Sequence, residues 1–199
     1  DARDVLLCRE ATALVGLASG ARVGTSSPRR EAQLCAARGD LEFAPIRGNV
    51  DTRVRKLESG EYDAIVLAAA GLHRLGIAFP EQAYLAPEIC LPAPGQAALC
   101  VETLAGGESL GAALDHSDSR RAIEAERAFA AELDAGCQVP LGAYATCSDG
   151  DISLRTVVAS ANGQELLRAS GHGRDPVVLG RRLAGEALEQ GAGQLLARG

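Results

Sequence analysis

A thiol and a set of arginines are the residues of this sequence whose types and spacing could do chemistry. Cys137 follows a helical pattern that runs from Asp118 to Leu133, and it precedes Pro140, which cannot continue a helix. We therefore expect Cys137 on a short loop, where a thiol is accessible for reaction rather than packed into a core. A tethering thiol and arginines suited to carboxylates together predict a protein that holds a polyanionic organic molecule covalently.

Two adjacent arginines stand at the start of a predicted helix. A strand over residues 21–25 ends there, Ser27 occupies the N-cap position and Pro28 the first helical position. The free N–H groups of this first turn and the helix dipole favour an anion, whereas the cations Arg29 and Arg30 oppose the dipole. An anion between the arginines and the helix end would explain their placement, and a pair of solvated surface arginines is the alternative.

The same arrangement occurs again after two further predicted strands. The strand over residues 41–46 is followed by Arg47 and by Asn49, which caps the next helix. The segment 63–69 contains a continuous apolar run over residues 64–69, typical of a central parallel strand, and it precedes a short helix over 71–75. Ligands bind beyond the carboxyl ends of the strands in an open parallel sheet, so we expect one edge to gather these side chains. The arginines predicted at this edge are Arg29, Arg30, Arg47, Arg53 and Arg74.

Strands and helices alternate in the first half of the chain, which predicts an α/β domain with a mostly parallel sheet. The proline-rich segment 87–96 then predicts a hinge, followed by a strand over 97–101 and a short helix over 108–114. The second half predicts a small α+β domain, in which one helix precedes and another follows a three-stranded antiparallel sheet. Its strands are expected over 139–146, 152–159 and 165–170, with turns at Asp149-Gly150 and Asn162-Gly163 and a last helix after Asp175-Pro176.

The composition limits the kind of protein. The chain has 199 residues, of which 47% are hydrophobic and 3% aromatic, so aliphatic side chains must form the core. The net charge is −6, but residues 22–56 hold eight basic and four acidic residues, which points to a local anion site rather than to nucleic-acid binding. With no apolar run long enough to span a membrane and no export signal, we expect a cytoplasmic protein with reduced thiols. The six cysteines lack the spacing of a metal site.

No residue stands out as a proton-transfer group. Lys56 is the only lysine and lies in a predicted helix, and the three histidines are scattered along the chain. A thiol hydrolase would need one of these histidines beside Cys137 in space. Another alternative is a non-catalytic carboxylate-binding module, which accounts for the arginines but gives no role to Cys137.

Several segments of the chain resemble the porphobilinogen deaminases, also called hydroxymethylbilane synthases, and the resemblance covers nearly the whole chain. The segments are Val23-Gly24-Thr25-Ser26-Ser27 with Arg29-Arg30, Arg47-Gly48-Asn49-Val50 with Thr52-Arg53, Gly60-Glu61-Tyr62-Asp63-Ala64, Ala70-Gly71-Leu72 with Arg74-Leu75-Gly76, Leu91-Pro92-Ala93 with Gly95-Gln96, and Gly136-Cys137-Gln138-Val139-Pro140-Leu141-Gly142. The last of these segments is the most specific.

The resemblance implies a fold of three domains, two of them similar to periplasmic binding proteins with a cleft between them. Residues 1–95 would form the second family domain, residues 96–116 a hinge and return segment, and residues 117–199 the third domain, which carries the cofactor. The first family domain would lie almost entirely ahead of Asp1. Because that domain holds the catalytic aspartate, no residue of this chain is assigned that role, and we expect the chain alone to be inactive.

The resemblance also implies the chemistry. The family polymerises four porphobilinogen units into hydroxymethylbilane in tetrapyrrole and haem biosynthesis, releasing ammonia, on a dipyrromethane primer that Cys137 would hold through a thioether. The five arginines would bind carboxylates of the cofactor and of the growing polypyrrole, and Ser27, Asn49 and Gln96 would supply polar groups of the cleft. The implied partners are these small molecules, with neither nucleic acid nor membrane, and the complete protein would be a monomer.

Overall fold

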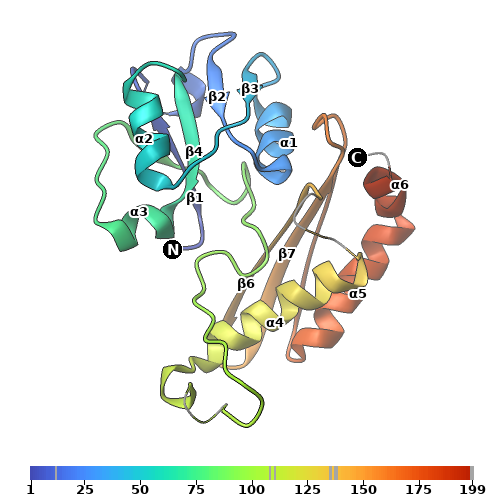
Figure 1. Ribbon diagram of the computed structural model, residues 1–199. Helices are drawn as coiled ribbons and strands as arrows, with labels where there is room; N and C mark the ends of the chain where they lie inside the picture. Colours follow the sequence, from blue (N-terminus) through green and yellow to red (C-terminus); the bar gives the residue numbers. More distant parts are fainter. Residues whose placement is uncertain (12, 108, 110, 135, 137–138, 198–199) are drawn as a thin grey trace.

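The chain folds into two parts, each built around its own sheet and hydrophobic core (Figure 1). The computed structural model describes all residues except 12, 108, 110, 135, 137–138 and 198–199. The first part is an α/β unit with a five-stranded sheet, and the second is an α+β unit with a three-stranded sheet. Both fold classes agree with the prediction from the sequence.

The alternation of strands and helices predicted for the first part is confirmed, with each boundary within a few residues of its expected place. Asn49 caps its helix as predicted, since its side chain accepts a hydrogen bond from the Thr52 backbone N–H. The elements are β2 (Arg22–Gly24), α1 (Pro28–Ala37), β3 (Glu42–Ala44), α2 (Val50–Glu58), β4 (Ala64–Ala68) and α3 (Ala69–Leu75).

Two strands of this sheet were not predicted, β1 (Asp4–Cys8) and β5 (Gln82–Tyr84), nor was the 3₁₀ helix η1 (Leu14–Gly16). The strand order is β3-β2-β4-β1-β5, and β1 runs antiparallel to both of its neighbours. Four of the five strands therefore point the same way and β1 alone is reversed. Because Asp4 pairs with Ala68, the beginning of β1 lies at the carboxyl end of β4.

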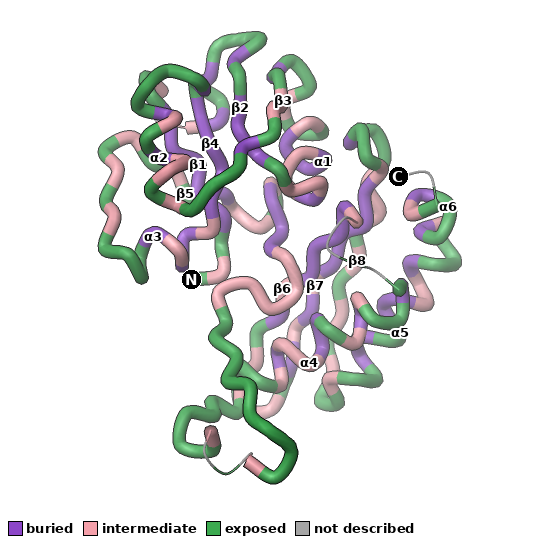
Figure 2. Tube along the Cα trace, viewed as in Figure 1, coloured by how far each residue is buried: buried purple, intermediate pink, exposed green. Residues whose placement is uncertain are grey.

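Helices cover both faces of this sheet, so the first part has three layers. Successive side chains of a strand point to opposite faces, and β1 follows this rule. Leu6 joins the core with Leu34 of α1, whereas Leu7 joins the core that contains Leu57 of α2 and Leu72 of α3. Figure 2 shows the buried strands at the centre of this arrangement. This parity also places Asp4 on the face that α1 covers.

Residues 97–101 do not form the predicted strand. Ala97 has a φ of +72°, and Leu99 is 80% exposed and Val101 56% exposed. Neither described sheet has a strand beside this apolar segment, so its backbone N–H and C=O groups have no strand to pair with. Of the short helix expected over 108–114, the structure has the 3₁₀ helix η3 (Ala112–Leu114), and residues 108 and 110 lie outside the described part of the chain.

The second part matches the predicted order of a helix, three antiparallel strands and a helix. Asp149 and Gly150, with φ of +52° and +78°, form the predicted turn between the first two strands. Asp175 caps the second long helix by accepting a hydrogen bond from the Val178 backbone N–H. The elements are α4 (Ser117–Glu132), β6 (Leu141–Ser148), β7 (Asp151–Ala159), β8 (Leu166–Gly173), α5 (Pro176–Glu189) and α6 (Ala192–Ala197), the last of which was not predicted.

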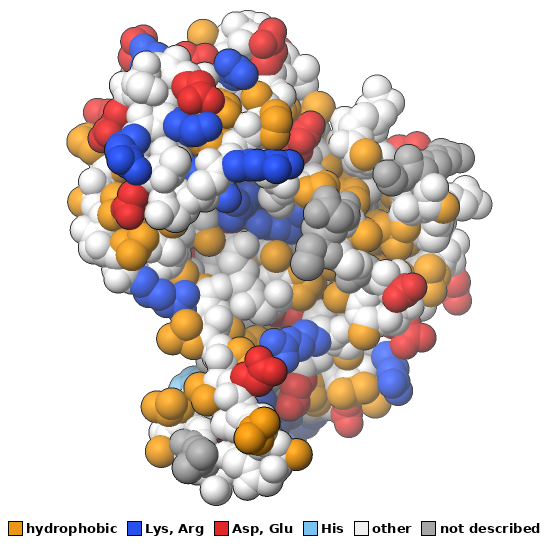
Figure 3. Space-filling model, viewed as in Figure 1, with side chains coloured by type: hydrophobic (Ala, Val, Ile, Leu, Met, Phe, Trp, Pro, Cys, Tyr) orange, Lys and Arg blue, Asp and Glu red, His pale blue; other side chains and the backbone are white. Residues whose placement is uncertain are grey.

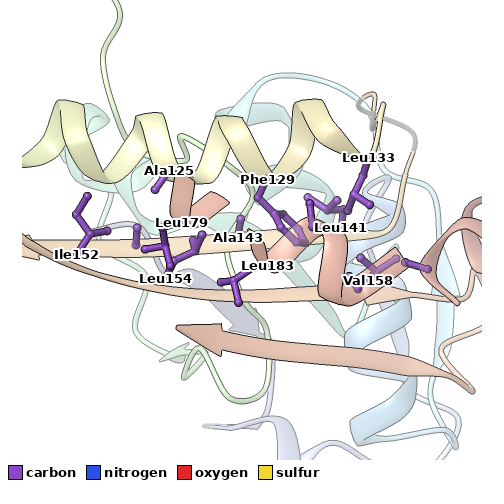
Figure 4. Packing of buried hydrophobic residues seen from close by; sticks show 14 of the residues in the cluster. Ala125, Phe129, Leu133, Leu141, Ala143, Ile152, Leu154, Val158, Leu179 and Leu183 are labelled. Atoms are coloured by element: carbon purple, nitrogen blue, oxygen red, sulfur yellow. The ribbon is translucent and has the colours of Figure 1, made fainter. Parts of the chain in front are cut away.

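The core of the second part lies between its sheet and the pair α4 and α5. Phe129 of α4 is fully buried and points toward side chains of the sheet and of α5, including Leu141 and Leu183 (Figure 4). The two helices approach closely at Gly180, where an added Cβ atom would stand 2.5 Å from the carbonyl oxygen of Ala125. Among the described residues, no helix combines the length and the hydropathy needed to cross a membrane.

Candidate functional site

A buried carboxylate, Asp4, lies at the centre of the predicted arginine edge. Its side chain is fully buried and faces α1, because Asp4 has the same parity in β1 as Leu6 and Cys8. The reversed direction of β1 brings this first residue of the strand to the carboxyl edge of β4. Asp4 was not predicted as a site residue.

Both carboxylate oxygens of Asp4 accept hydrogen bonds from the arginines at the start of α1. Oδ2 lies 2.7 Å from Nη1 of Arg29, and it also accepts from the Cys90 thiol at 3.3 Å. Oδ1 accepts from Nε and Nη2 of Arg30 at 3.1 and 2.8 Å. Nε2 of Gln96 adds a further hydrogen bond of 2.9 Å to Oδ1. The carboxylate therefore ties β1, α1 and the segment after β5 together.

The two arginines also bind backbone carbonyls around this carboxylate. Nη1 of Arg29 donates to the carbonyl of Leu91 at 2.6 Å, and its Nη2 donates to Oε1 of Gln96 at 3.1 Å. Nη1 of Arg30 donates to the carbonyl of Val66 at 3.2 Å. Arg29 is only 4% exposed, and the sequence did not predict that it is buried.

The electrostatics of this cluster leave it with a net positive charge. Burial alone would raise the pKa of Asp4, but the guanidinium groups of Arg29 and Arg30 outweigh it and hold the pKa below its usual value. Burial raises the pKa of the Cys90 thiol to about 12, so this thiol stays neutral. One negative and two positive charges therefore remain in the cluster.

The second predicted turn adds further positive charge. Nε of Arg53 donates to the carbonyl of Gly48 at 2.8 Å, and the pKa of Arg53 is lowered first by burial and then by the nearby Arg30. Arg47 is exposed. Neither Arg47 nor Arg53 forms an ion pair with any acid of the described chain. In Figure 3, Lys and Arg side chains gather in the recess below the α/β part.

The other predicted site residues lie around this cluster in different ways. Ser27 is the N-cap residue of α1, but its side chain forms no capping hydrogen bond. Asn49 is exposed and its side-chain oxygen is used by the cap of α2. Nη2 of Arg74 donates to the carbonyl of Ala97 at 2.5 Å, so this arginine is bound to the segment that follows Gln96.

Cys137 lies outside the described residues, so the structure does not locate this thiol. The structure describes the ends of the two elements on either side of it. α4 ends at Glu132, and Asp134 has a left-handed φ of +49° just after that end. Pro140 is buried, and its carbonyl accepts a hydrogen bond of 2.9 Å from the Ala159 N–H. The predicted position of Cys137 between α4 and the second sheet is therefore bounded by fixed ends.

A second buried carboxylate, Glu126 of α4, connects the two parts. Oε2 accepts a hydrogen bond of 2.6 Å from the Gly95 N–H, and Oε1 accepts one of 2.7 Å from the Ala145 N–H of β6. Burial raises the pKa of Glu126 to about 7, although both backbone hydrogen bonds oppose that shift. Because Gly95 directly precedes Gln96, Glu126 fixes the segment that reaches the Asp4 cluster.

Asp4 and Glu126 could have been noticed in the sequence as acids next to apolar residues. Asp4 opens the run Val5-Leu6-Leu7-Cys8, and Glu126 stands among the alanines of α4. An acid at such a position must be paired when it is buried. Their partners are 25 and 31 residues away in sequence, so the pattern signals burial but not the partner.

Comparisons with known proteins agree on one family. Residues 1–112 match the family model described as "Porphobilinogen deaminase, dipyromethane cofactor binding domain", and residues 121–189 match "Porphobilinogen deaminase, C-terminal domain". The porphobilinogen deaminase of Brevibacillus brevis is 46% identical over 201 residues, which cover 99% of this chain and 65% of that protein. That of Roseiflexus sp. is 48% identical, covering 99% of this chain and 66% of its own.

The chain thus spans about 65% of the length of these relatives. A third, from Geobacillus kaustophilus, is 46% identical over all of this chain. Among solved structures, an ABC transporter / periplasmic binding protein from Brucella ovis with glutathione bound matches 45% of this chain with a TM-score of 0.32 and 21% identity, too low a similarity for any argument.

Proposed function

Because the chain belongs to the porphobilinogen deaminase family, we propose that it binds and carries the dipyrromethane cofactor of a tetrapyrrole-forming transferase. The observation that supports this proposal most is the excess of guanidinium groups at the edge of the first sheet. Asp4 is the carboxylate bound within that cluster, and it balances only one of the charges of Arg29 and Arg30. A ligand with several carboxylates would supply the missing negative charge.

The donor set suits such a ligand. Each pyrrole ring of the cofactor and of the growing product carries an acetate and a propionate group. Guanidinium groups bind carboxylates with two parallel hydrogen bonds, and Arg53, close to Arg30 and without an acidic partner in the described chain, is available for one. We propose that the cofactor and porphobilinogen are held by Arg29, Arg30, Arg47, Arg53 and Arg74, with polar contacts from Ser27, Asn49 and Gln96.

We propose that Cys137 holds the cofactor through a thioether. The cofactor supplies the primer onto which porphobilinogen units are added, and it stays attached to the protein.

On this proposal residues 1–95 form the carboxylate-binding domain, residues 96–116 cross between domains, and residues 117–199 form the cofactor-attachment domain. The protein is cytoplasmic, and its partners are porphobilinogen and the growing polypyrrole.

The intact mass of the purified chain tests this proposal. We expect the wild-type chain to exceed the mass of its sequence by one dipyrromethane unit, because Cys137 forms a covalent bond to it. The variant Cys137→Ser should have the unmodified mass. Cys100→Ser, which alters an exposed thiol elsewhere in the chain, is the matched control and should retain the added mass.

A wild-type chain at its unmodified mass, with porphobilinogen binding that Cys137→Ser leaves unchanged, would instead favour a non-catalytic carboxylate-binding module. That alternative uses the same arginine edge and needs no thiol. The intact mass and the porphobilinogen affinity of Cys137→Ser together separate the two functions.

We also propose that the whole enzyme joins four porphobilinogen units into hydroxymethylbilane and that residues 1–199 by themselves do not. The carboxylate at the arginine edge, Asp4, already accepts five hydrogen bonds and has no lone pair left for a reacting group. We expect no ammonia release above background when residues 1–199 are incubated with porphobilinogen, and a full-length relative measured in parallel gives the positive control. Turnover by the chain alone would show that it contains a catalytic acid that we have not identified.

A further inference from the structure

We propose that Asp4 is a positioning residue, which fixes the guanidinium groups of Arg29 and Arg30 in the orientation that binds the carboxylates of the ligand. The proposal rests on the function proposed above for the arginine edge. It assigns Asp4 a role through the arginines and no contact with the ligand.

The hydrogen bonds of Asp4 exclude a direct role. Each of its oxygens accepts at least two donors, Arg29 and Cys90 at Oδ2, and Arg30 and Gln96 at Oδ1. The side chain is fully buried. A carboxylate in this state cannot accept a proton from a ligand without losing an existing partner.

The contacts of Arg30 show what Asp4 fixes. Nε and Nη2 of Arg30 donate to Oδ1 of Asp4, and Nη1 donates to the carbonyl of Val66. A guanidinium group has five N–H groups in one plane, so these three bonds set the direction of the remaining two. A free arginine side chain would have to lose its rotamer entropy on binding, whereas this one is already ordered.

Gln96 extends the same support to Arg29. Its Oε1 accepts from Nη2 of Arg29, while its Nε2 donates to Oδ1 of Asp4 and to the carbonyl of Ala2 at 2.7 Å. One amide therefore links the carboxylate to the more buried arginine. Because Gly95 is held by Glu126, this link also connects the cluster to the second part of the chain.

The variant Asp4→Asn distinguishes two effects of Asp4 on ligand binding, its orientation of the two arginines and its negative charge. It keeps the size of the side chain but removes one negative charge beneath two cations, so electrostatics alone predicts tighter binding of an anion. Positioning predicts the opposite, because the two arginines lose charge-assisted hydrogen bonds and their fixed orientation. The probe is porphobilinogen, and its dissociation constant for residues 1–199 is measured by titration calorimetry. We expect binding about tenfold weaker in Asp4→Asn.

Asp51→Asn is the matched control. It removes an exposed carboxylate of α2 at the same edge without touching the Asp4 cluster. We expect binding as tight as in the wild type or slightly tighter. Equal or tighter binding in Asp4→Asn as well would overturn the positioning role while leaving the proposed function intact.

A second measurement does not depend on ligand binding. Phenylglyoxal modifies accessible arginines, and the rates at Arg29 and Arg30 are followed by peptide mass spectrometry relative to the exposed Arg47. We expect slow modification in the wild type and a several-fold faster reaction at both residues in Asp4→Asn. If the wild-type chain does not bind porphobilinogen, the proposed function fails, and unchanged rates in the variant would then overturn the positioning role as well.

Should Asp4→Asn fail to fold in a thermal melt, Gln96→Leu tests the same support without changing the net charge. It removes the hydrogen bonds to Asp4 and Arg29 from a half-buried side chain. A several-fold faster phenylglyoxal reaction at Arg29 in a folded Gln96→Leu chain supports the positioning role, and an unchanged rate contradicts it.

Discussion

Replacing Phe129 by alanine is expected to lower the free energy of unfolding by about 3–5 kcal/mol. Phe129 is fully buried in the largest hydrophobic cluster of the second part, between α4, the sheet and α5. The substitution loses the burial of an aromatic ring and leaves a cavity that the surrounding helices and strands cannot close completely. Urea denaturation followed by circular dichroism measures the effect.

The matched control is Val178→Ala, which shortens a 63% exposed side chain of α5. We expect it to change the free energy of unfolding by less than about 0.5 kcal/mol. An equally small change for Phe129→Ala would show that α4 is not packed on the sheet as the structure has it.

Glu126→Gln is expected to change how stability depends on pH. The pKa of Glu126 is raised to about 7 by burial, whereas that of a glutamate in the unfolded chain is near its ordinary value of about 4.3. Between these two values the folded state binds the proton and the unfolded state does not, so wild-type stability falls as the pH rises through this window. The variant has no proton to lose there.

The free energy of unfolding of Glu126→Gln minus that of the wild type should therefore increase by about 3 kcal/mol between pH 4 and pH 7.5, because only the wild type loses stability in this range. Denaturant titrations at several pH values give this difference directly. Glu189→Gln, an exposed position of α5, is the control and should show no such trend. A difference that does not vary with pH would contradict the raised pKa of Glu126.

Elements with strong local signals could be predicted from the sequence. Asn49 and Asp175 cap their helices because a side-chain oxygen two or three residues away satisfies a free N–H group, and this needs no distant contact. The turn at Asp149-Gly150 follows from the conformations that these two residue types tolerate. The arginines after the strand ends were assigned to one edge for a different reason, because the carboxyl ends of parallel strands lie at the same edge of a sheet.

Elements that depend on distant neighbours were missed or misplaced. The short strand β5 has no periodic pattern of its own and exists because it pairs with β1. The run 97–101 has the pattern of a strand but remains unpaired, since no strand of the described chain lies beside it. β1 was overlooked although it is fully buried, because a run of four apolar residues after an aspartate has no distinctive local pattern.

The sequence by itself determined the order of the elements, their caps and turns, and the residue types at the carboxyl edge of the first sheet. These depend on interactions within a few residues. Only the tertiary structure decided that Arg29 and Arg30 bind a buried carboxylate and that Glu126 holds the segment before Gln96. The reason is physical: a buried charge is stable only beside a partner, and the direction of β1 and the packing of α4 bring those partners together from distant parts of the chain.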